Sequence, residues 1–153
     1  MKKIISLILV LLFITACGNG QGEYYLSYSG KDIKLDTVYN IETHGKYNRL
    51  FESANCAFGD RDVTYIYDDI EVETYGNKKN ELIIYSIRLT TDKAKTNEGI
   101  GLNDSIEDVI RVYGNDYTKY NNKYTYKQGK TSLIFITNND IIESIEYELN
   151  NIN

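Results

Sequence analysis

The feature that most constrains the fold is a set of short strand-like segments near the end of the printed sequence. Residues 124–126, 131–137 and 141–149 are rich in Tyr, Thr and Ile, and turn-forming residues separate them. Their side chains fall on two sides with a period of two, which is typical of strands, and the short turns favour antiparallel pairing. The pattern therefore predicts a three-stranded antiparallel meander.

A helix is predicted immediately before these strands. Residues 106–113 place four apolar side chains at the spacing of one helix face, and Gly114 follows as a typical terminator. Asp104, with Glu107 three residues later, is expected to cap the first turn.

The same order occurs, more loosely, in the first half of the chain. A helix-like stretch at 36–44 comes before strand-like segments at 65–67, 70–75 and 82–89. We therefore predict an α+β fold of two tandem repeats, residues 30–95 and 96–153. Each repeat would be a helix followed by a three-stranded antiparallel meander. The two meanders would form one sheet of about six strands with the helices on one face.

The amino-terminal segment carries a targeting signal. Two lysines come before residues 4–14, which are apolar except for Ser6, and Ala16 and Cys17 follow. This order resembles the lipobox of bacterial lipoproteins, which implies cleavage of residues 1–16 and a lipid such as palmitate on Cys17. An ordinary signal peptide or an uncleaved anchor are the alternatives. Residues 17–29, rich in Gly and polar side chains, would then be a flexible tether.

The net charge and the number of cysteines limit which partners the chain is expected to bind. A formal net charge of −5 argues against nucleic acid and against an anionic membrane surface, which leaves lipid on Cys17 as the tether to the cell membrane. With Cys17 lipidated, Cys56 has no partner, so we expect it to be a small buried hydrophobe. A reactive thiol or an intermolecular bridge are the alternatives. We expect an extracytoplasmic monomer without cofactor.

Several strings resemble a group of uncharacterised clostridial lipoproteins over roughly residues 30–149. They are Cys56-Ala57-Phe58, Tyr65-Ile66-Tyr67, residues 70–75, residues 96–100 and residues 109–114. The tandem layout is similar to the β-lactamase inhibitory protein fold and to small outer-membrane-assembly lipoproteins of the SmpA/OmlA type. The resemblance implies a sheet face that grips a protein partner, and no contact residue is carried over.

Other polar residues favour structural roles. His44 lies near the end of a predicted helix, where a cation is stabilised. The acidic residues of 60–73 lack the loop of a calcium site, and Gly99-Ile100-Gly101 lacks a phosphate-loop context. We expect no metal site.

Strand tyrosines are the remaining candidates for a binding site. They pack in the core or form an exposed aromatic face, as tyrosines do at many interfaces. The five candidates are Tyr65, Tyr67, Tyr75, Tyr124 and Tyr126. No residue set supports catalysis, so we expect a non-enzymatic protein-binding module. An envelope assembly lipoprotein and a hydrolase that uses acidic residues are the alternatives.

Overall fold

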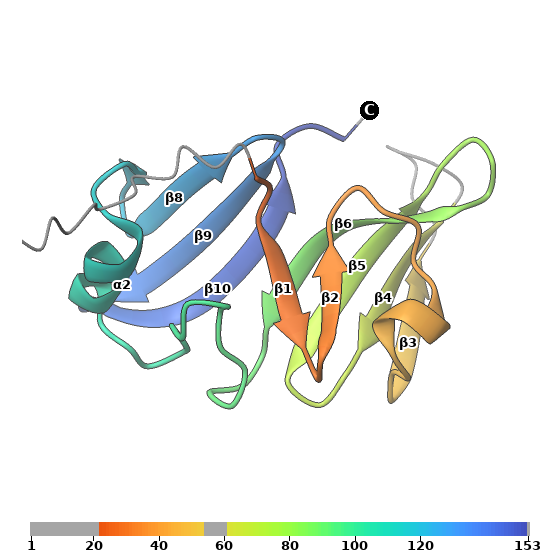
Figure 1. Cartoon of the computed structure of the whole chain (residues 1–153), viewed down its shortest axis with the longest axis horizontal. Coiled ribbons are helices and arrows are strands. Elements are labelled where there is room, and N and C mark those ends of the chain that lie inside the picture. Colours follow the sequence, from red (N-terminus) through yellow and green to blue (C-terminus); the bar gives the residue numbers. More distant parts are fainter. Residues whose placement is uncertain (1–21, 54–60, 153) are drawn as a thin grey trace, which may run out of the picture.

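The computed structural model describes residues 22–53 and 61–152, and this part of the chain is mostly β (Figure 1). It contains ten strands and two short helices, α1 (Ile41–His44) and α2 (Ile106–Tyr113). The strands are β1 (Tyr25–Tyr28), β2 (Lys31–Lys34), β3 (Arg49–Ser53), β4 (Asp62–Ile66), β5 (Ile70–Gly76), β6 (Leu82–Leu89), β7 (Thr118–Tyr120), β8 (Lys123–Gln128), β9 (Thr131–Asn138) and β10 (Ile141–Leu149).

Eight of the strands form one antiparallel sheet in the order β3-β4-β5-β6-β10-β9-β8-β7. Strands β3 to β6 form one meander and β7 to β10 form another. The two meanders join where β6 pairs with β10, with Ile87 opposite Tyr147 and Leu89 opposite Ile145. The two remaining strands, β1 and β2, form a separate hairpin.

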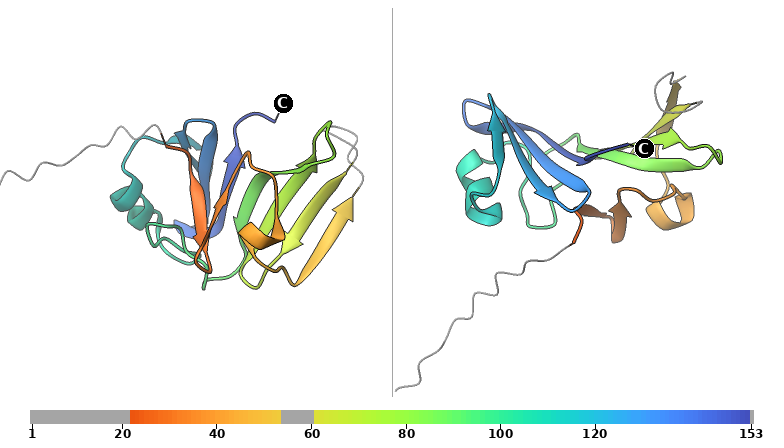
Figure 2. Two further views of the ribbon diagram at one scale, coloured as in Figure 1. Left: turned by 45° about the vertical axis from the view of Figure 1, so that its right-hand side comes forward. Right: turned by 90° about the horizontal axis from the view of Figure 1, so that it is seen from above.

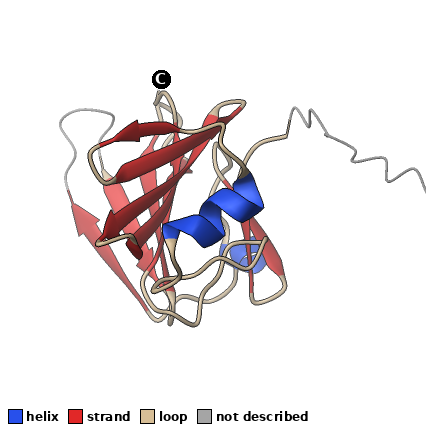
Figure 3. Ribbon diagram, turned by 90° about the vertical axis from the view of Figure 1, so that its left-hand side faces the viewer, coloured by secondary structure: helices blue, strands red, loops and turns tan. Residues whose placement is uncertain are grey.

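One face of the sheet is covered and the other is not. The β1–β2 hairpin, α1 and α2 all lie on the same side of the sheet (Figures 2 and 3). Leu26 and Ile33 of the hairpin are buried in the same apolar cluster as Val72, Ile145 and Phe135 of the sheet. We call this side the covered face and the opposite side the uncovered face.

Helix α2 covers the half of the sheet made by β8, β9 and β10. Its Tyr113 ring lies 5.6 Å from the ring of Phe135, centroid to centroid. Ser105 and Asp108 form a capping box, so the prediction that Asp104 and Glu107 cap this helix was wrong. Asp104 instead accepts a hydrogen bond from the backbone N–H of Gly101. The helix ends at Gly114 as predicted.

The first predicted helix is reduced to the single turn of α1, which the Asn40 side chain caps. Its expected first half is extended instead, because it pairs with β6. The N–H of Asp36 donates to the carbonyl oxygen of Ile84 (2.9 Å), and the N–H of Tyr39 donates to that of Leu82 (2.7 Å). β-branched and aromatic residues at 37–39 favour this extended path.

The predicted α+β fold of two repeats, each a helix followed by three strands, was therefore wrong. A helix was expected to cover the sheet in the first half of the chain, but the β1–β2 hairpin lies over it instead. Each meander has four strands, not the three that were predicted. The sequence analysis identified no strand at 49–53 or at 118–120, which form β3 and β7. Residues 25–28, which were assigned to the flexible tether, form strand β1.

Several predictions concern residues outside the described ranges. The signal peptide, its cleavage site at Ala16 and Cys17, and the state of Cys56 all lie there. Within residues 22–53 and 61–152, no helix has the length and apolar character needed to cross a bilayer.

Candidate binding surface

The strand register fixes which side chains share the uncovered face. Paired residues in an antiparallel sheet point to the same side, so the pairs can be followed from strand to strand. One row across the sheet runs Arg49, Ile66, Glu71, Arg88, Glu146, Ile134, Thr125 and Thr118. The next row runs Phe51, Thr64, Glu73, Ser86, Glu148, Ser132 and Lys127.

Arg88 is the centre of an ion-pair network on this face. Its guanidinium lies 2.7 Å from Glu73, 3.8 Å from Glu71 and 4.0 Å from Glu146. These side chains come from β5, β6 and β10, so the network spans the junction of the two meanders. Nearby carboxylates raise the pKa of Arg88, although burial opposes them. The guanidinium therefore stays charged and holds three carboxylates in place.

Glu148 lies beside this network without a salt bridge of its own. Burial raises the pKa of its carboxyl group; Lys123 opposes this effect, and Glu146 adds to it. A hydrolase with paired carboxyls needs two such groups free for acid and base roles. Here Glu71, Glu73 and Glu146 are engaged by Arg88, so the arrangement offers a charged binding surface more readily than an acid–base pair.

Apolar side chains lie between the charges. Ile134 is only 2% exposed although no described element packs over it. It forms part of the lining of a hollow of about 310 Å³, together with Glu148, Lys123, Lys127 and hydroxyl-bearing residues of β7 to β9. At the other end of the face, Phe51 is 65% exposed. The uncovered face is thus acidic over β5, β6 and β10, basic along β8, and apolar at the exposed ring of Phe51.

The five candidate tyrosines do not form an exposed aromatic face. Tyr65, Tyr67, Tyr124 and Tyr126 belong to the apolar cluster of the covered face, and none of them is more than 7% exposed. Tyr65 stacks on Tyr39 at 3.6 Å, centroid to centroid. They serve as core residues, which was the alternative role left open by the sequence.

Tyr75 alone among the five points to the uncovered face, and there it is buried too. It lies opposite Ile83 in the register, and its ring is 6.1 Å from that of Tyr85. Burial and the nearby Glu73 raise the pKa of Tyr85 above its ordinary value. These two rings form an aromatic border to the charge network.

His44 has a structural environment. It is buried at the end of α1, and its Nδ1 lies 3.0 Å from both the backbone nitrogen and the backbone oxygen of Asn40. Burial lowers its pKa, so the imidazole is neutral at pH 7. Within the described residues, no side chain near His44 forms a nucleophile–base pair with it, so His44 serves as a structural residue.

The remaining acidic candidates separate into two places. Asp68 and Asp69 form the β4–β5 turn, where Asp68 accepts a hydrogen bond from the Asn48 side chain and Asp69 accepts one from Thr91 Oγ1, both at 2.6 Å. Glu71 and Glu73 belong to the uncovered face. Among the residues that the structure describes, no cluster of His, Cys, Asp and Glu has the arrangement of a metal site.

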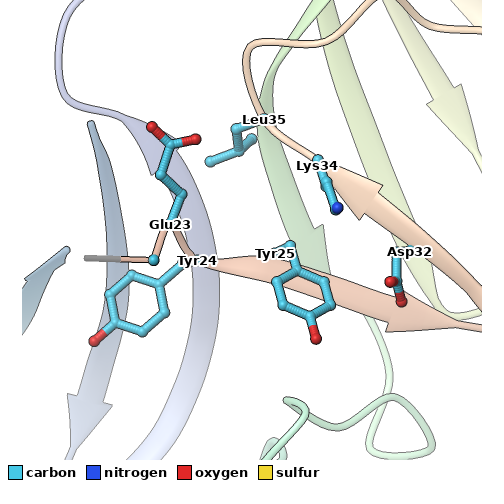
Figure 4. A pocket seen from close by; sticks show the side chains of 7 residues that line it. Glu23, Tyr24, Tyr25, Asp32, Lys34 and Leu35 are labelled. Carbon is cyan, nitrogen blue, oxygen red and sulfur yellow. The ribbon is translucent and has the colours of Figure 1, made fainter. Parts of the chain in front are cut away.

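A hollow of about 470 Å³ also lies beside the β1–β2 hairpin. Figure 4 shows that residues at the start of β1 and along β2 line it, including Tyr24, Tyr25, Asp32 and Lys34. The Lys34 ammonium lies 5.8 Å from the centre of the Tyr25 ring. These groups mix both charges over a short hairpin, and they give no set of residues suited to one reaction.

Sequence reasoning missed the residues at the centre of the uncovered face. Neither Arg88 nor Glu146 was among the candidate site residues. In the structure β6 pairs with β10, and Arg88 stands opposite Glu146. The signal was present in the alternation of charges, but the pairing of β6 with β10 had to be known to read it.

Comparison with known proteins gives no family for the chain. No protein-family model, no curated protein and no solved structure matches it.

Proposed function

We propose that the chain is a lipid-anchored, extracytoplasmic protein-binding module whose uncovered face meets the partner. The observation that carries the proposal is the network of Arg88 with Glu71, Glu73 and Glu146. It fixes charged groups on a broad sheet face, next to exposed Phe51 and the hollow lined by Ile134. Fixed charges set the orientation and the choice of a protein partner, and an exposed apolar side chain such as Phe51 adds affinity.

A crosslinking pull-down from intact cells tests the binding surface. Thr64→Arg and Thr125→Arg place a long cation on the uncovered face without removing a member of the ion-pair network. Thr43→Arg adds the same side chain on α1 at the covered side, as the matched control. We expect both uncovered-face variants to recover about tenfold less partner, equal to about 1.4 kcal/mol of binding free energy.

Equal recovery of the partner by all three variants would show that the uncovered face is not the binding surface. If the unchanged chain recovers no specific protein, the proposal that it binds a protein partner is wrong. Stable co-purification with one large membrane complex would favour the envelope assembly alternative.

The anchor is tested separately through Cys17→Ala. We expect this variant to lose the mass of the lipid and to leave the membrane fraction, because several acyl chains at about 0.8 kcal/mol per CH₂ are what holds the chain there. A variant that stays with the membrane at an unchanged mass would contradict the proposed lipid.

A further inference from the structure

The two edges of the eight-stranded sheet differ in how well they are protected. Strand β7 has three residues, and one of them is a lysine, Lys119. Short edge strands and edge lysines are common protections against pairing with another chain. Strand β3 has five residues, all exposed, and includes neither lysine nor proline. Its register with β4 runs without a bulge from Arg49 to Ser53.

Within residues 22–53 and 61–152 no strand pairs with the outer side of β3, which presents a defined set of backbone hydrogen-bonding groups. The N–H of Tyr67 donates to the carbonyl oxygen of Ile70 at 3.0 Å, which fixes the alternation of bonded pairs between β4 and β5. By that alternation Thr64 and Ile66 turn their backbone groups toward β3. Phe51 and Arg49, which lie opposite them, turn theirs toward β4. The N–H and C=O groups of Leu50 and Glu52 therefore point away from the sheet.

These groups are complementary to those of a second copy of the same strand. When two β3 strands pair antiparallel about a two-fold axis at Phe51, Leu50 of each lies opposite Glu52 of the other. All four outward groups of each strand are then paired. An axis at Leu50 would require the N–H of Asn48, which instead donates to the carbonyl oxygen of Ile66 at 2.8 Å. The register about Phe51 is therefore favoured.

The side chains fit the same register. Phe51 is 65% exposed and would face its own copy on the uncovered side. Leu50 is 44% exposed and would lie along the stem of Glu52 on the other side. Arg49 would face Ser53, so no two like charges stand directly opposite each other. Pairing would bury the two exposed apolar side chains of this edge.

We propose that β3 is a self-association edge, through which two copies join their sheets about Phe51. A five-residue edge buries less surface than the roughly 1,200–2,000 Å² of a stable interface, so the dimer is weak and depends on concentration. The sequence had led us to expect a monomer. The inference does not depend on the proposed partner of the uncovered face, although pairing would cover Phe51 and leave the Arg88 network open to that partner.

Disulfide trapping in the full chain tests this register. A cysteine pair at a non-hydrogen-bonded antiparallel site has Cα atoms about 4.5 Å apart, within the range of a disulfide. With Cys56 replaced by Ser, we expect Phe51→Cys to crosslink about tenfold faster than Tyr120→Cys, because pairing raises the effective concentration of the two thiols. Tyr120, on edge strand β7, is the control for simple collision, since it is 76% exposed. Leu50→Cys should crosslink no faster than this control.

Sedimentation of the purified full chain over a series of concentrations gives a second measurement. The unchanged chain should shift toward the mass of a dimer, and Phe51→Lys should remain a monomer. Equal crosslinking of the Phe51 and Tyr120 variants, faster crosslinking at Leu50 than at Phe51, or a chain that stays monomeric throughout would each overturn the proposal.

Discussion

Arg88→Gln should lower the free energy of unfolding by about 1–3 kcal/mol at pH 7 and low salt, since a half-exposed ion pair contributes roughly 0.2–1 kcal/mol. Three such pairs are lost, with Glu73 at 2.7 Å, Glu71 at 3.8 Å and Glu146 at 4.0 Å. The Arg88 side chain is 42% exposed, so solvent screens each pair and keeps its contribution small. The carboxylates that remain would also repel one another.

Urea unfolding of the wild-type chain and the variant, followed by circular dichroism, measures this loss. High salt should shrink the difference, because dissolved ions screen these partly exposed pairs. Arg111→Gln is the control, because Arg111 pairs with Asp108 alone on the exposed surface of α2. An Arg88 variant as stable as wild type, or a loss that salt does not change, would refute the electrostatic reasoning.

Four further outcomes are expected from urea unfolding. The raised pKa of Glu148 means that stability declines as pH rises from its ordinary value of 4.5, so Glu148→Gln should be more stable than wild type at pH 7 and equal to it at lower pH. The lowered pKa of His44 has the opposite sign: stability is lost as pH falls below 6.5, and His44→Phe should remove that loss. Ser105→Ala should cost about 1 kcal/mol, because it removes the capping box of α2. Phe135→Ala should cost about 3–5 kcal/mol, because this fully buried ring packs against α2; a loss under about 1 kcal/mol would contradict its place in the core.

The sequence was most informative where structure depends on neighbours along the chain. The strands at 70–76, 82–89 and 131–138 lie within a residue of their predicted bounds, and α2 ends at Gly114 as expected. Periodicity and turn residues are local signals, so one sequence is enough to read them.

Tertiary contacts decided the rest. Residues 36–40 form no helix because β6 offers them carbonyl oxygens, a partner more than forty residues away. Tyrosine suits a core as well as a surface, so alternation in β4 and β8 could not say that the face bearing Tyr65 and Tyr124 is the covered one.

The same limit applies to the candidate site. Alternation puts Glu71 and Glu73 on one side of β5, and the pairing of β5 with β6 sets Glu71 opposite Arg88. Only the pairing of β6 with β10 brings Glu146 to the same guanidinium. The sequence by itself determined the strands at 70–76, 82–89, 131–138 and 141–149 and the charges that they carry. The pairing of distant strands decided which charges meet, because strand order is set by burial of the whole sheet and not by any single segment.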